Sequence, residues 1–129
     1  MKTKKPYKTT AKHFKLFCDT ATYWLKRLGV LDYEVEYQHV ALEGLGQTEY
    51  DVINRWAEMR LSADFGKTVP TDREIKATAF HEVIELMMAE LICIASSRYG
   101  VSWDDIERAK HRIIRQIENA FFSDYEAKP

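Results

Sequence analysis

The stretch on which the predicted fold depends is Ala79-Phe80-His81-Glu82-Val83-Ile84-Glu85-Leu86. It lies inside a longer helical pattern that runs from Thr71 to Ser97. A capping box begins the pattern, because Thr71 stands at the N-cap position and Glu74 follows three residues later. Pro70 precedes the pattern and Gly100 follows it, and both residues are typical of helix boundaries. We therefore predict one central helix over residues 71–98.

His81 and Glu85 are expected to project side by side from this helix, since residues four apart lie on the same face. Glu82 lies about 100° further round the axis. The arrangement matches the HExxH helix of zinc hydrolases, in which two helical residues hold the metal and the Glu acts as general base. In this chain Glu85 stands where that pattern has its second His.

A second helix is predicted over residues 102–122, where Ser102-Trp103-Asp104-Asp105 forms another capping box. A catalytic zinc takes three protein ligands and keeps one position open for water. His81 and Glu85 supply two ligands, and the third is expected from this helix. The candidates are His111 and Glu107, one turn apart, and we favour His111, with Glu107 as an alternate ligand or as a residue that orients the ligands.

Glu82 would then take a proton from the metal-bound water, as the general base. The opposing interpretation is an ordinary helix that holds no metal. Glu is a good helix former, so an HExxE sequence on a helix is a weak pattern by itself. His39, at the end of a predicted strand, is interpreted as a structural or surface residue.

The rest of the chain predicts a small α+β fold with a single domain over residues 1–129. An N-terminal helix over residues 10–28 is capped by Thr9 or Thr10 and closed by Gly29. Residues 32–40 and 54–63 alternate polar and apolar side chains, so we expect two strands that pair antiparallel across a loop at 41–50. Residues 1–9 read as a basic flexible arm, and residues 123–129 as a frayed tail.

Composition limits the classes of function. The chain has 129 residues, with 19 basic and 20 acidic side chains and a formal net charge of −1. This balance does not predict a nucleic-acid partner. No apolar run reaches the roughly 18 residues needed for a membrane span, and no signal peptide is recognisable. Cys18 and Cys93 are interpreted as buried free thiols, so a cytoplasmic location is expected. The sequence does not indicate an oligomeric state.

The order of these elements resembles small phage-encoded zincin-like metallopeptidases. The resemblance covers roughly residues 10 to 122 and depends on two helical motifs, residues 79–86 and residues 106–119. In that family the first motif usually reads HExxH, and the second commonly has Glu-His where this chain has Lys110-His111. The resemblance implies a minimal zincin-like domain with zinc as cofactor and a peptide or protein as substrate.

Two hypotheses about function follow. The first is a zinc-dependent metallohydrolase or peptidase of a phage or prophage, in which His81, Glu85 and His111 hold zinc and Glu82 is the base. The second is a degenerate zincin fold without catalytic activity, which serves as a binding or accessory protein for a partner from the host or the phage.

Overall fold

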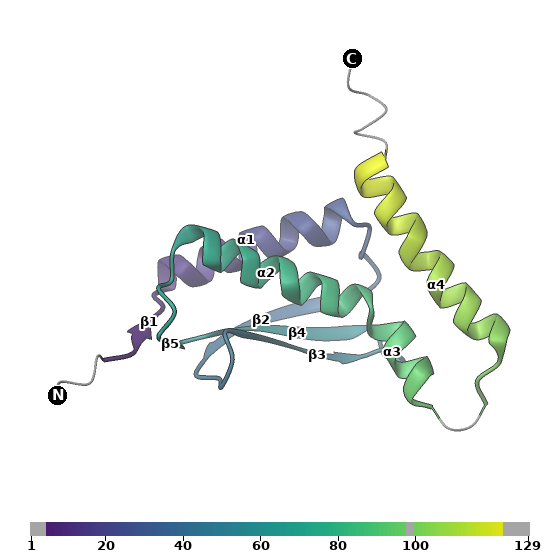
Figure 1. Ribbon diagram of the computed structural model, residues 1–129, viewed down its shortest axis with the longest axis horizontal. Helices are drawn as coiled ribbons and strands as arrows, with labels where there is room; N and C mark the ends of the chain where they lie inside the picture. Colours follow the sequence, from purple (N-terminus) through teal and green to yellow (C-terminus); the bar gives the residue numbers. More distant parts are fainter. Residues whose placement is uncertain (1–4, 98–99, 123–129) are drawn as a thin grey trace, which may run out of the picture.

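The computed structural model describes residues 5–97 and 100–122, and these form a mixed α+β fold as predicted. Helices α1 and α2 lie side by side on one face of a three-stranded sheet, and α4 crosses one end of this layer (Figure 1). The elements follow in the order β1 (Tyr7–Lys8), α1 (Ala11–Arg27), β2 (Glu34–Val40), β3 (Gly46–Asp51), β4 (Trp56–Ser62), β5 (Asp64–Gly66), α2 (Asp72–Met87), α3 (Ala89–Ser96), α4 (Trp103–Ile117) and a π-helical turn (Glu118–Phe122).

The three-stranded sheet is mixed, with the strand order β2-β4-β3. Both predicted strands exist, but the prediction that they pair antiparallel is wrong. Strand β2 runs parallel to β4, from the pair Glu34–Trp56 to the pair Val40–Ser62. The reason is that the expected loop at 41–50 contains β3, which forms an antiparallel hairpin with β4. Strand β2 therefore joins β4 from the other side.

Residues 41–45 carry the chain across the end of β4, between the two outer strands. Ser62 anchors this crossing, since its backbone N–H donates to Leu45 O at 2.8 Å and its Oγ accepts from the Leu42 N–H at 3.1 Å. The N–H of Ala63 donates to Val40 O at 2.8 Å. These bonds hold the start of β3 next to the end of β4, on the side of the sheet where β3 contacts α2.

The alternation of β4 divides its side chains between the two faces of the sheet as predicted. Ala57, Met59 and Leu61 are buried beneath α1 and α2. On the opposite face Arg60 donates to Glu58 and Glu49, each at 2.6 Å. The main core consists of apolar side chains from the sheet and the two covering helices, including Phe17, Leu28, Met59, Leu61, Ile75, Val83 and Leu86.

Two local predictions about the N-terminal region have different outcomes. Helix α1 is confirmed, with Thr10 at its N-cap and a positive φ of 70° at Gly29 after its end. The flexible arm predicted for residues 1–9 is wrong at its C-terminal end. Tyr7 and Lys8 pair with β5, and Thr9 Oγ1 is buried and donates to Ser62 O at 2.7 Å. Residues 1–4 and the tail 123–129 lie outside the described residues.

The single central helix predicted over 71–98 is wrong, because it breaks at Met88 into α2 and α3. The Thr71 cap is confirmed by a 3.2 Å bond from the Glu74 N–H to Thr71 Oγ1. Beyond Met88 the chain changes direction, and α3 packs on α4. Cys93, expected to be buried, is exposed on α3, while Cys18 is half-buried. In the described ranges no helix combines the length and apolar character needed to cross a membrane.

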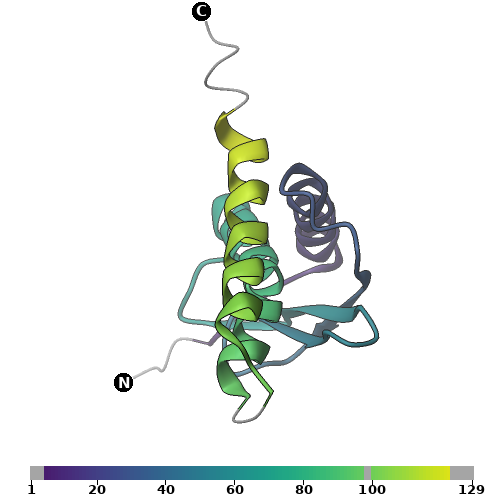
Figure 2. The ribbon, with the colours of Figure 1, turned by 90° about the vertical axis from the view of Figure 1, so that its right-hand side faces the viewer.

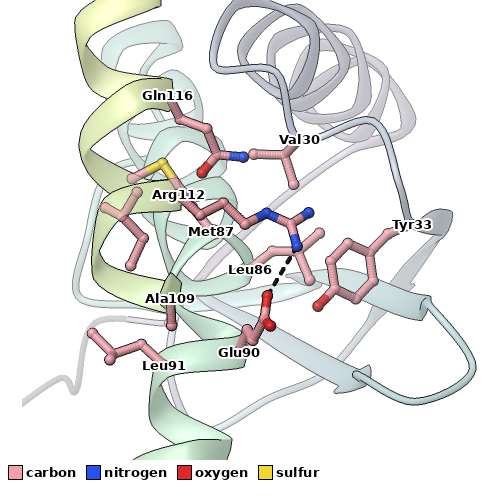
Figure 3. A pocket seen from close by; sticks show the side chains of 10 residues that line it. Val30, Tyr33, Leu86, Met87, Glu90, Leu91, Ala109, Arg112 and Gln116 are labelled. Carbon is pink, nitrogen blue, oxygen red and sulfur yellow. Dashed lines mark hydrogen bonds and ion pairs between the residues drawn. The ribbon is translucent and has the colours of Figure 1, made fainter. Parts of the chain in front are cut away.

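Helix α4 begins at the predicted Ser102 cap and packs across the end of the layer of helices, as Figure 2 shows from the side. Arg112 is the polar anchor of this contact. It donates to Glu90 Oε2 on α3 at 2.9 Å and also binds Asp32 just before β2. A cavity of about 10 Å³ remains beside this ion pair (Figure 3). The last turn of the predicted helix is a π-helical turn.

Candidate functional site

The predicted motif lies at a groove between α2 and the start of β3. Six residues line this groove, which has a volume of about 290 Å³. Leu45 and Gly46 form one wall, and the other comes from α2 through Ala77, Thr78, His81 and Glu82. These four residues of α2 form two pairs, each four positions apart in sequence, so one helix face forms that wall. We call this feature the α2–β3 groove.

Glu82 is the buried acidic residue of the groove, with 5% of its surface exposed. Thr48 Oγ1 on β3 lies 2.8 Å from Glu82 Oε1 and 3.2 Å from the Glu82 carbonyl oxygen, so its hydroxyl donates to this residue. Burial raises the pKa of the Glu82 carboxyl above its ordinary value. The Thr48 hydrogen bond and nearby His81 act in the opposite direction, while Glu85 raises the pKa further.

Gly46 allows β3 to approach α2 closely enough for this contact. A Cβ atom placed on Gly46 would lie 2.8 Å from Thr78 Cγ2, 3.1 Å from Glu82 Oε2 and 3.3 Å from Arg60 O. Sequence reasoning placed Gly46 in a loop and assigned it no role. An isolated Gly at the start of a strand is the signal that would have identified it, since such a glycine often marks a close backbone approach.

His81 and Glu85 lie side by side as predicted, with 3.3 Å between His81 Nε2 and Glu85 Oε1. Both side chains are exposed, by 69% and 55% respectively. Burial raises the pKa of the Tyr50 phenol on β3. Negative charge on nearby Cys93 and Glu85 raises this pKa further. Glu85 thus stands at the edge of the region between α2 and β3.

His111 and Glu107 form a second pair on α4. His111 Nδ1 lies 2.8 Å from the Glu107 carbonyl oxygen and 3.7 Å from Glu107 Oε2. The His111 side chain is 58% exposed. The side of α4 that contacts the rest of the protein carries Ala109 and Arg112 instead. Helical spacing places Ala109 of α4 and Ala120 of the π-helical turn on one apolar side, and both are buried. Arg112 adds its ion pairs beside them.

The predicted convergence of His81, Glu85 and His111 on one ion is therefore absent from this arrangement. Within residues 5–97 and 100–122, no three His, Cys, Asp or Glu side chains are grouped so that they could hold a metal ion. The described side chains thus supply His81 and Glu85 as neighbouring ligands but no third ligand beside them. Neither His111 nor the alternate ligand Glu107 is grouped with this pair. Zinc binding stays a prediction.

Comparisons of the chain with protein-family models, with curated proteins and with solved structures find no match. The class that the fold defines is a small α+β protein with two helices on one face of a mixed sheet. The zincin-like arrangement and the phage origin stay predictions from the sequence.

Proposed function

We propose that this protein is a binding protein that takes up an extended segment of a partner protein along strand β3, beside the α2–β3 groove. The observation that carries the proposal is the place of β3 at the edge of the sheet, paired only with β4 within the described chain. An edge strand offers unpaired backbone N–H and C=O groups to another extended chain. The groove borders this edge and would receive a side chain of the bound segment.

The groove has a mixed lining that favours a short side chain able to donate hydrogen bonds. Leu45 and Ala77 provide apolar contact, and Glu82 and His81 provide polar groups. One oxygen of Glu82 already accepts from Thr48, so this carboxyl also serves the fold by joining α2 to β3. Because this hydrogen bond gives Glu82 a structural role, its place in the groove does not require it to act as a catalytic base.

The second candidate is the zinc-dependent hydrolase, in which Glu82 is the base. Two observations favour it: the raised pKa of Glu82 and the contact between His81 and Glu85. It requires a third ligand that the described residues do not place at the site. We therefore rank it second and derive no catalytic step from it.

A peptide selection tests the proposal. Ten-residue peptides displayed as a random library would be selected on the immobilised full chain, and the best peptide would be titrated while amide shifts are followed by NMR. We expect the largest shifts in β3 and around Gly46. N-methylation of alternate peptide amides should abolish binding in one register only, because only every second amide pairs with an edge strand. Shifts confined to the opposite edge strand, β2, would contradict the proposal.

Hydrolysis is tested on the same peptide in parallel. The wild-type protein and Glu82→Gln would be incubated with the peptide in zinc or in EDTA, and the products analysed by mass spectrometry. We expect binding in both solutions and no cleavage. Binding of about one zinc per chain, together with cleavage that Glu82→Gln abolishes, would establish the hydrolase instead.

A further inference from the structure

A separate hollow lies between α1 and α2, on the other side of Ala77 from the α2–β3 groove. It has a volume of about 480 Å³ and is lined by Trp24 from α1 and by Arg73, Lys76, Ala77 and Phe80 from α2. The four α2 residues follow helical spacing and belong to one face of that helix. Neither hypothesis from the sequence uses this face.

Aromatic rings form the apolar part of the hollow. Trp24 and Phe80 pack edge to face, with ring centroids 4.8 Å apart and an interplanar angle of 67°. Tyr23 and Phe121 extend the cluster, at 5.1 Å and 6.3 Å from the Trp24 ring. Trp24 and Phe80 are only half-buried, so parts of their rings remain accessible in the hollow. Accessible aromatic faces can stack on another flat ring.

Two cations lie beside these rings. Arg73 and Lys76 are exposed, and neither forms an ion pair or side-chain hydrogen bond with another residue of the described ranges. By contrast, Arg60 and Arg112 are each engaged by two carboxylates. Arg73 and Lys76 stand one turn apart, so both can reach a single anionic group. Asp72 and Glu74 of the same turn do not line the hollow.

We propose that this hollow binds a small anion that carries a flat aromatic ring, of the nucleoside monophosphate class. The base would lie against Trp24 and Phe80, while the phosphate would bind Arg73 and Lys76. A phosphate carries more charge than a carboxylate and offers three terminal oxygens, which suits two neighbouring cations. Aromatic side chains that stack on bases, combined with nearby cations that bind phosphate, recur in proteins that bind the nucleotides of single-stranded nucleic acids, and this hollow carries both. The proposal is independent of the α2–β3 groove.

Fluorescence of Trp24 provides a direct measurement. In a Trp56→Phe/Trp103→Phe variant of the full chain, Trp24 is the remaining tryptophan. Adenosine 5′-monophosphate should change its emission in a saturable way, and adenosine or inorganic phosphate alone should bind at least about tenfold more weakly. Calorimetric titration of the wild-type protein repeats the measurement without any substitution.

Neutral variants test the two cations. Arg73→Gln and Lys76→Gln should each weaken nucleotide binding by about tenfold, because each removes a charge-assisted bond to phosphate. Lys67→Gln is the matched control, an exposed lysine that does not line the hollow, and it should leave binding unchanged. Circular dichroism would verify that the variants fold.

Three results would overturn the proposal. The first is the absence of saturable binding in both fluorescence and calorimetry. The second is equal affinity for the nucleotide in wild type, Arg73→Gln and Lys76→Gln. The third is equal or tighter binding of N-acetylphenylalanine, which would assign the hollow to an aromatic carboxylate such as a peptide C-terminus.

Discussion

Thr48 Oγ1 donates to Glu82 Oε1 across a distance of 2.8 Å, and this bond joins the edge strand β3 to the middle of α2. The residue that the sequence motif presents as a base is thus also a structural link between sheet and helix. Glu82 is 5% exposed, and this burial raises the pKa of its carboxyl, so ionisation of Glu82 in the folded protein is disfavoured.

Glu82 should therefore make stability depend on pH. Its pKa is raised in the folded state, so the native protein holds this proton more tightly than the unfolded chain. The contribution of Glu82 to the free energy of unfolding is fully present below the ordinary Glu pKa. It is lost as the pH rises through the raised pKa of the folded state. Urea denaturation at pH 4, 6 and 8 should show that Glu82→Gln removes this loss. At pH 8 the variant should be more stable than wild type.

The control for this comparison is Glu43→Gln, which changes an exposed residue of the 41–45 crossing. Its dependence on pH should match that of wild type. If Glu82→Gln is less stable than wild type at pH 8, then ionised Glu82 stabilises the fold and the assignment of its pKa shift to burial is wrong.

Gly46→Ala should destabilise the protein by about 1–3 kcal/mol, the usual cost of overpacking. The added Cβ would lie 2.8 Å from the Thr78 methyl carbon and 3.3 Å from a backbone oxygen. Thr78→Ser removes that methyl group and keeps the hydroxyl, so it should recover part of the loss in the double variant. Gly44→Ala is the control, since its Cβ would meet only Gly46 O at 3.8 Å. Equal unfolding free energies for the two alanine variants would refute the close approach.

Arg112→Met should loosen the packing of α4. The side chain is 36% exposed and joins Glu90 and Asp32 to this helix. We therefore expect the free energy of unfolding to fall by about 1–2 kcal/mol, a value between those typical of surface and of buried ion pairs. Hydrogen exchange should accelerate in α4 more than in β4. Arg108→Met is the control, because Arg108 pairs with Asp105 on the same helix. Equal exchange in the two variants would show that Arg112 does not anchor α4.

The two cysteines should react at different rates with iodoacetamide at pH 8. Burial raises the pKa of the Cys18 thiol to about 11, and neighbouring Asp19 acts in the same direction, so little reactive thiolate forms there. Cys93 is exposed on α3. Peptide mass spectrometry should find Cys93 alkylated first and Cys18 only after denaturation. Rapid labelling of Cys18 in the native protein would contradict the packing of α1.

Features that depend on neighbouring residues were predictable from the sequence. Each of the caps at Thr10, Thr71 and Ser102 accepts a hydrogen bond from a backbone N–H three residues later. The contact between His81 and Glu85 follows from helical spacing in the same way. The alternation of β4 also identified the side chains that point into the core.

Features that depend on distant partners were not predictable. The parallel pairing of β2 with β4 follows from a third strand inside the segment taken for a loop. The break at Met88 occurs in a stretch of good helix formers, and the change of direction lets α3 pack on α4. Ala109 of α4 and Ala120 of the π-helical turn are buried as their helical spacing indicates, but the ion pairs of Arg112 with its acidic partners were not predicted. The side chain of His111 lies on a more exposed side of α4 and is not grouped with His81 and Glu85.

The strand order β2-β4-β3 has a consequence for how the chain acquires its structure during synthesis. The central strand leaves the ribosome last, so β2 and β3 are both made before the neighbour that each requires. Strand β3 finds β4 through a short hairpin, whereas β2 must wait and then close a longer loop, which is slower. We expect the β3–β4 hairpin to form first and β2 to complete the sheet afterwards. Until β2 has paired, α1 lacks part of the sheet surface on which it packs.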